Sequence, residues 1–360
     1  MKLVFVVAVI VMALHATPLG LPDLKIPNDN PQTEVKIMLG DQLYHDPRFS
    51  ADGKVSCSTC HAREKGFTDN LRVSKGFKDR TGTRNAPTVI NAAYYTSQFW
   101  DGRSPDLEDQ STHPPINPVE GGLSSHKDMI DIVKADDHYK DMFAKVFKVR
   151  PGQITIDHIA KAIASFERTI ISGDSAFDRY MYGGEEGALN AAEKRGLDVF
   201  LNQGRCVSCH TMNQSYALFT DNKFYNIGVG VKRLGGKEQS IAKSFLKSTM
   251  KGGQSVDLEV LSNADASELG RFAVTKDVTE MGAFKTPTLR NIEKTFPYMH
   301  DGSLQTLEQV VTFYNEGGRL NAKAMESSFL DGGIRPLNLS KEQQKDLVSC
   351  LKALTSPEYK

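Results

Sequence analysis

The sequence predicts a mainly α-helical protein built from two similar domains that are related by internal duplication. Its 360 residues are long enough for two domains of ordinary size, each with its own hydrophobic core. A Cys-x-x-Cys-His motif at Cys57–His61 recurs at Cys206–His210. Apolar residues follow a helical period, and strand-like alternation is almost absent. We therefore expect a signal peptide at residues 1–18, an N-terminal domain at 19–175 and a C-terminal domain at 176–360.

The internal repeat becomes visible when the two halves are aligned. A tetrapeptide that follows the first motif, Phe67–Asn70, recurs after the second motif as Phe219–Asn222. Further on, the halves match without gaps at an offset of 200 residues, as in Pro87–Asn91 with Pro287–Asn291, Asp101-Gly102 with Asp301-Gly302, and Leu107-Glu108 with Leu307-Glu308. Each half is therefore expected to fold as a similar unit.

Each half also contains a helical apolar period before its motif and another at its end. The periodicity predicts helices at about Val35–Tyr44, Asp157–Ile171, Ala191–Leu201 and Lys341–Leu354. Ser340 and Gln343 form a capping box for the last helix, which also carries the fifth cysteine, Cys350, as a buried thiol. The glycine-containing stretch Gly173–Gly187 is expected to be the linker between the domains.

The N-terminus has the pattern of a secretory signal. Met1-Lys2 precedes an apolar run from Leu3 to Leu14, with a small residue, Ala16, near the expected cleavage site. An uncleaved membrane anchor is the alternative, although the run is too short to span a bilayer. We expect a periplasmic mature protein without a membrane span. Lys and Arg together number 44, as do Asp and Glu, so no basic excess indicates a nucleic-acid partner.

The two Cys-x-x-Cys-His motifs predict two covalently attached haems of the c type. The thiols of Cys57 and Cys60 are spaced to add across the two vinyl groups of one haem, and His61 follows as the proximal iron ligand. Cys206, Cys209 and His210 repeat the arrangement. A redox or zinc pair is the alternative for a single motif, but no further Cys or His pair lies nearby to complete zinc sites. Two cytochrome c-like haem domains are therefore expected.

The aligned halves differ at positions expected to lie near the haems. Trp100 falls on His300, Gln110 on Val310, and Pro114 on Tyr314. A proline side chain cannot bind iron, whereas a tyrosine phenolate can. We therefore expect the first haem to be open on its distal side and the second to be closed by Tyr314.

These motifs resemble the bacterial di-haem cytochrome c peroxidase family, including its MauG branch. The similarity covers nearly the whole mature chain and is clearest at Leu39-Gly40, Phe99–Arg103, Asn117–Glu120 and Pro297–Gly302. It implies that peroxide reacts at the N-terminal haem and that the C-terminal haem transfers electrons. By the same resemblance, Trp100 lies between the haems, and Glu120 and Gln110 form the distal pair.

Each of these residues also has a simpler interpretation. Trp100 would otherwise be a core aromatic, and Glu120 a solvated loop residue. Beside an open iron, Glu120 is expected to take a proton from the near oxygen of peroxide and return it to the far one, with Gln110 orienting the peroxide. His113, next to Pro114, is either an iron ligand, an aid to Glu120 or a satisfied loop histidine.

The resemblance also implies one calcium ion between the haems. Asn85, Thr295 and Pro297 match the residues that bind it, and amide and carbonyl oxygens suit a hard cation. Structural turn residues are the competing interpretation for all three.

Two departures favour the MauG-like branch. Phe77 replaces a histidine that blocks the reactive haem in other members, and Tyr314 replaces a methionine on the second haem. The expected function is therefore a MauG-like peroxidase that uses hydrogen peroxide and passes oxidising equivalents through Trp100 to the second haem. Its partner would be a periplasmic electron-donor protein or a substrate protein with an oxidised side chain. The alternatives are a donor-dependent cytochrome c peroxidase that removes peroxide, and a non-enzymatic di-haem electron carrier.

Overall fold

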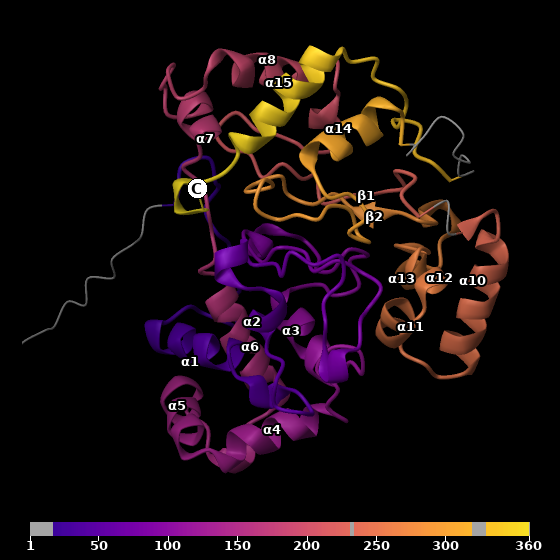
Figure 1. Cartoon of the computed structure of the whole chain (residues 1–360). Helices are drawn as coiled ribbons and strands as arrows, with labels where there is room; N and C mark the ends of the chain where they lie inside the picture. The colour runs from indigo at the N-terminus through magenta and orange to yellow at the C-terminus, as the bar shows by residue number, and fades with distance from the viewer. Residues whose placement is uncertain (1–16, 231–233, 319–328, 360) are drawn as a thin grey trace, which may run out of the picture.

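The computed structural model describes residues 17–230, 234–318 and 329–359, and most of the expected signal peptide lies outside them. The chain is mainly helical, as predicted, and Figure 1 shows the N-terminal half below the C-terminal half. The helices of the N-terminal half are α1 (Glu34–Tyr44), α2 (Cys57–Cys60), α3 (Leu107–Ile116), α4 (His126–Ala135), α5 (Asp137–Phe147) and α6 (Ile156–Glu167). Those that follow are α7 (Ala176–Met181), α8 (Ala191–Leu201), α10 (Glu238–Leu246), α11 (Val256–Ser262), α12 (Ala264–Ser267), α13 (Phe272–Thr275), α14 (Leu307–Asn315) and α15 (Lys341–Lys352).

The four helices predicted from periodicity are all present, as α1, α6, α8 and α15. They form two equivalent pairs, α1 with α6 and α8 with α15. Each pair approaches closely at a glycine. A Cβ atom on Gly40 would lie 1.9 Å from the carbonyl oxygen of Ala162, and one on Gly196 would lie 1.9 Å from that of Asp346. The duplication predicted from the repeat thus extends to helix packing.

Sheet structure is limited to two strands of two residues each among the described residues. Strands β1 (Phe224–Tyr225) and β2 (Phe284–Lys285) pair antiparallel, with Phe224 opposite Lys285. Both strands lie in the second half, and the backbone N–H of Lys285 also donates to the carbonyl of Trp100 at 2.8 Å. This ribbon therefore contacts the first half near Trp100.

The hydrophobic core consists of separate clusters. One lies in the N-terminal half between Leu39 and Ile163, another joins α8, α14 and α15, and a third joins α10 to α13. Cys350 is buried in the second cluster, and Ser340 and Gln343 form the predicted capping box. The domain boundary at residue 175 stays a prediction.

Part of the expected linker is helical and packed in the interior. Helix α7 lies within Gly173–Gly187, and Phe177 and Asp178 are fully buried. Asp178 accepts two hydrogen bonds from Arg290, at 2.8 and 2.9 Å, which explains why this segment is held in the interior.

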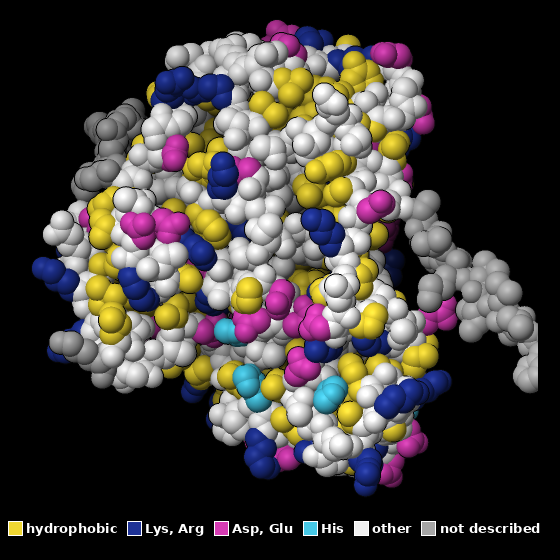
Figure 2. Space-filling model, turned by 180° about the vertical axis from the view of Figure 1, so that it is seen from behind, with side chains coloured by type: hydrophobic (Ala, Val, Ile, Leu, Met, Phe, Trp, Pro, Cys, Tyr) yellow, Lys and Arg dark blue, Asp and Glu magenta, His cyan; other side chains and the backbone are white. Residues whose placement is uncertain are grey.

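No helix among the described residues is long and apolar enough to cross a membrane. Lysine and arginine side chains are spread over the rear face, whereas acidic side chains gather near its centre (Figure 2).

Candidate active site

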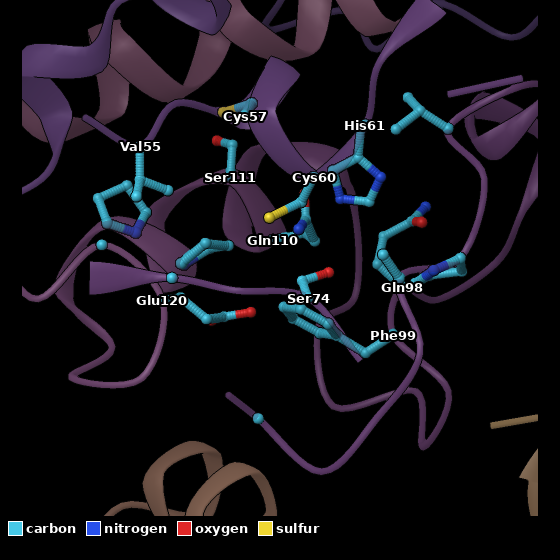
Figure 3. A pocket seen from close by; sticks show the side chains of 18 of the residues that line it. Val55, Cys57, Cys60, His61, Ser74, Gln98, Phe99, Gln110, Ser111 and Glu120 are labelled. Atoms are coloured by element: carbon cyan, nitrogen blue, oxygen red, sulfur yellow. The ribbon is translucent and has the colours of Figure 1, made fainter. Parts of the chain in front are cut away.

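The first Cys-x-x-Cys-His motif lies on the wall of a cavity in the N-terminal half. Ser56 and Thr59 cap the short helix α2, which places Cys57 and Cys60 one turn apart. His61 ends the helix, with its N–H donating to the carbonyl of Cys57 at 3.0 Å. All three side chains line the cavity, and Figure 3 shows Cys60, His61 and Gln110 around one hollow.

The second motif lines a larger cavity in the C-terminal half. Cys206 and Cys209 flank a 3-10 turn, and His210 follows. Tyr314, on α14, lines the same cavity, and burial raises the pKa of its phenol well above the usual value. A deprotonated Tyr314 in this site would need a cation such as ferric iron beside it.

Both motif histidines are oriented by the tetrapeptide that the two halves share. The Nδ1 atom of His61 lies 3.2 Å from the carbonyl oxygen of Phe67, and that of His210 lies 2.9 Å from the carbonyl oxygen of Phe219. Both phenylalanines have a left-handed backbone, with φ of 55° and 53°. Because a carbonyl only accepts, each Nδ1 donates and leaves Nε2 free to bind a metal.

Burial also lowers the pKa of both imidazoles, which favours the neutral form that an iron ligand requires. Within the described residues, no group of three or more His, Cys, Asp or Glu side chains could hold a metal ion. These observations fit haem better than zinc at both motifs.

Trp100 lies between the two cavities. It lines both of them, as does the segment 85–88. Its indole Nε1 donates to the carbonyl of Asn85 at 2.9 Å, so the ring is held in place from the same segment. This position is intermediate, as the resemblance implied.

The distal residues predicted for the first haem come together in the N-terminal cavity. Gln110 and Pro114 reach it from α3, and Glu120 reaches it from the turn after that helix (Figure 3). The Oε2 atom of Glu120 is shielded from water and finds no hydrogen-bond partner among the described residues. Burial, reinforced by the charge of Asp257, raises the pKa of Glu120 to about 7, against the opposing effects of Arg103 and His113.

Phe77 packs beside this turn rather than in the wall of the cavity. Its backbone N–H donates to the carbonyl of Glu120 at 2.6 Å. The segment around Phe77 therefore supports the Glu120 turn in this chain.

His113 lies on helix α3, not on a loop as expected. It does not belong to the cavity wall in the described structure. Its Nε2 atom lies 3.3 Å from the carboxylate of Asp109, and its Nδ1 atom lies 3.7 Å from that of Asp257. Two acidic side chains therefore hold the imidazole of His113 in this position.

The three residues matched to a calcium site all line the C-terminal cavity. Asn85, Thr295 and Pro297 come together there from both halves of the chain. The side-chain Nδ2 of Asn85 donates to the backbone carbonyl of Leu71 at 2.9 Å. The backbone carbonyl of Asn85 accepts from the indole N–H of Trp100. A cation at this point would therefore lie close to Trp100. The calcium site stays a prediction.

Comparison with known proteins decides the family. A family model described as "Di-haem cytochrome c peroxidase" matches residues 34–186. Cytochrome-c peroxidase IdrP1 of Pseudomonas sp. (strain SCT) is 32% identical over 349 residues, which cover 96% of this chain and 87% of that protein. The chain belongs to the di-haem cytochrome c peroxidase family.

This di-haem peroxidase is also similar to members of the MauG branch. Methylamine utilization protein MauG of Methylorubrum extorquens is 34% identical over 328 residues, which cover 91% of this chain and 80% of that protein. A crystal structure of a MauG-like protein associated with microbial copper homeostasis superposes with a TM-score of 0.76 at 31% identity, covering 96% and 98% of the two chains. The predicted fold class and family are confirmed, and the protein is an oxidoreductase that carries two haems and uses peroxide.

Residues that the sequence did not single out also line the peroxidase's N-terminal cavity. Glu167 reaches it from the end of α6, and burial raises its pKa to about 8. Leu261 reaches it from α11, in the second half of the chain. The sequence does contain one signal for the extra segment that carries α11, because two matched pairs of residues have different spacings in the two halves. Asn70 precedes Pro87 by 17 positions, whereas Asn222 precedes Pro287 by 65 positions. The second half therefore contains a long insertion.

Proposed function

We propose that this protein is a MauG-like peroxidase in which hydrogen peroxide reacts at the N-terminal haem, attached through Cys57 and Cys60 and ligated by His61. Cys206, Cys209 and His210 would hold the second haem in the same way. One observation carries the proposal: the Oε2 atom of Glu120 has no hydrogen-bond partner in the described structure, and Glu120 lines the N-terminal cavity. That cavity has Pro114 at the position where the C-terminal cavity has Tyr314.

When bound, the first haem supplies the electrons that split the O–O bond of peroxide. The residues of the chain manage the protons. Glu120 takes a proton from the near oxygen of peroxide and returns it to the far oxygen, so that water leaves rather than hydroxide. A pKa of about 7 suits this exchange, because the carboxyl can both accept and return a proton near neutral pH. Gln110, across the same cavity, would orient the peroxide by hydrogen bonding.

Trp100 would then carry oxidising equivalents from the first haem to the second. Its contacts with both cavities and its fixed indole N–H support this route. The anionic phenolate of Tyr314 would favour the ferric and higher states of the second haem, whereas a methionine would raise its potential. A calcium ion bound by Asn85, Thr295 and Pro297 would hold the region between the haems.

The final electrons would come from a periplasmic donor protein or from a side chain of a partner protein that becomes oxidised. Because Phe77 cannot bind iron, the fully oxidised protein should react with peroxide without prior reduction. A donor-dependent cytochrome c peroxidase would need the half-reduced form first. A plain electron carrier would gain nothing from Glu120 in an open cavity.

Rapid mixing of the ferric two-haem protein with peroxide tests the proposal. Glu120→Gln should slow the reaction by about 10²- to 10⁴-fold, the range typical for loss of a general acid or base. Glu167→Gln is the matched control, because it removes another carboxyl of the same cavity whose Oε2 also lacks a hydrogen-bond partner within the described chain. It should change the rate by less than about tenfold. Equal effects of the two substitutions, or reaction only after half-reduction, would contradict the proposal.

A further inference from the structure

Helices α10 to α13 form a lobe that comes from the C-terminal half but packs against the N-terminal half. We call residues 238–275, which Figure 1 shows beside the N-terminal half, the inserted lobe. The lobe has its own hydrophobic cluster. Thr83 donates to the carbonyl of Val260 at 2.7 Å, and Val119 packs against the cluster. Leu261 completes part of the N-terminal cavity. The lobe therefore borders the proposed peroxide site.

Asp257, in the first turn of α11, is the acidic residue that the lobe brings to this border. Its carboxylate accepts from Arg103 Nε at 2.8 Å and from Asn117 Nδ2 at 2.6 Å, and it lies 3.7 Å from His113 Nδ1. Only 15% of its side chain is exposed, and 6% of that of Arg103. Hydrogen bonds to a charged carboxylate are short and strong, so Asp257 holds Arg103 and Asn117 together, with His113 beside them.

All three partners of Asp257 precede Glu120 in the sequence, and two of them, Arg103 and His113, carry charges that act on its carboxyl. Asn117 also accepts from the backbone N–H of Val119 at 3.0 Å and begins the turn that ends at Glu120. The carbonyl of Asn117 accepts from the N–H of Glu120, again at 3.0 Å. Moving Asn117 would therefore move Glu120.

The charged groups around Asp257 and Glu120 come from several elements. Arg103 and Asp101 follow Trp100, Asp109 and His113 lie on α3, and Glu120 follows α3. Arg84 joins the group through Asp101 at 2.6 Å. Burial alone would raise the pKa of Asp257, but His113, Arg103 and Asn117 hold it well below its usual range. Asp257 is therefore an anion across the neutral pH range.

We propose that Asp257 is a positioning residue of the peroxide reaction, through which the inserted lobe fixes the Glu120 turn and sets the charge around the Glu120 carboxyl. This inference rests on the proposed role of Glu120 as acid and base. Asp257 itself lies outside the cavity wall within the described structure, and it acts through Arg103, Asn117 and His113.

Asp257 and His113 should shift the pKa of Glu120 in opposite directions. The negative charge of Asp257 raises the pKa of Glu120, and the positive charge of His113 lowers it. Asp257 has the larger influence of the two, although its removal also makes His113 easier to deprotonate. A purely structural role would not produce opposite shifts.

The experiment is the pH dependence of the reaction between ferric two-haem protein and hydrogen peroxide, from about pH 5 to about pH 9. In the parent, the rate should rise with pH around a midpoint of about 7, because deprotonated Glu120 accepts the proton. Asp257→Asn should lower this midpoint by about one pH unit, and His113→Gln should raise it. Asp265→Asn, an exposed position of the same lobe, is the matched control and should leave the midpoint in place.

The outcomes separate this inference from the function on which it rests. If Glu120→Gln abolishes the pH dependence while Asp257→Asn leaves the midpoint unmoved, the positioning role of Asp257 is refuted and that of Glu120 stands. If Asp257→Asn lowers the rate by the same factor at every pH, the positioning role of Asp257 is also refuted. If Glu120→Gln keeps the parent profile, the role of Glu120 itself fails. If Asp257→Asn does not fold, the His113→Gln variant decides. A midpoint of its pH–rate profile that is equal to or below that of the parent overturns the proposal.

Discussion

Replacing Arg290 with methionine should strongly destabilise the protein, because it leaves a carboxylate buried without its cation. Both Arg290 and Asp178 have no exposed side-chain surface. The guanidinium makes two bonds to Asp178, at 2.8 and 2.9 Å, and also donates to the carbonyls of Ala217 and Gly20 at 2.7 and 2.6 Å. These bonds join the N-terminal segment, α7 and the C-terminal half.

The size of the effect follows from burial. Removing one partner of a buried ion pair typically costs about 3–5 kcal/mol in the free energy of unfolding. Ser175 continues to donate to Asp178 through its backbone N–H and its hydroxyl, which limits the loss. We therefore expect the lower part of this range, about 3 kcal/mol, and a fall in Tm on the order of 5 °C.

Arg195→Met is the matched control. Arg195 makes the same two-bonded contact with Asp346, at 2.7 and 2.9 Å, but 56% of its side chain is exposed. Its loss should cost much less than that of Arg290, because solvent screens an exposed ion pair. Thermal and denaturant unfolding of both variants, followed by circular dichroism, supplies the comparison. Equal losses in the two variants would show that burial does not decide the strength of the pair, and the reasoning would be wrong.

Three further predictions concern the haems and the region between them. If Pro114 leaves the first iron open and Tyr314 closes the second, as proposed, the ferric protein should give one high-spin and one low-spin signal in electron paramagnetic resonance. Two low-spin signals would contradict the open site. With Tyr314→Met, one equivalent of peroxide should still react at the first haem, but the second haem should no longer store an oxidising equivalent, as followed by absorption spectra of both haems; storage as in the parent would remove the MauG-like assignment. If calcium binds as proposed, Asn85→Ala should lose it in metal analysis, and Trp100→Phe should retain it but slow transfer between the haems. Retention of calcium in the Asn85 variant would exclude that ligand.

The local parts of the site could be predicted from the sequence. Two cysteines and a histidine separated by one helical turn predict a haem attachment site almost independently of the rest of the fold, since their geometry depends on adjacent residues only. The repeated tetrapeptide ending at Asn70 and Asn222 is local in the same sense, because its phenylalanine carbonyl orients the histidine a few residues earlier. The four helices found by periodicity depend on near neighbours too, because an apolar repeat of helical period runs along each of them.

Other features needed the folded chain. Asp257 is separated from Asn117 by 140 residues and from Arg103 by 154, so no spacing in the sequence relates them. Likewise, Phe177 and Asp178 look like part of a linker until the buried Arg290 is seen beside them. The contact of His113 with Asp257 also depends on long-range packing.

The sequence by itself thus determined the family, the two haem motifs, the duplication and the helices that carry them, because short-range spacing and hydrophobic period encode these. The tertiary structure decided which charges surround Glu120 and which half of the chain supplies them, because proton affinity depends on burial and on charges brought within a few ångströms by long-range packing.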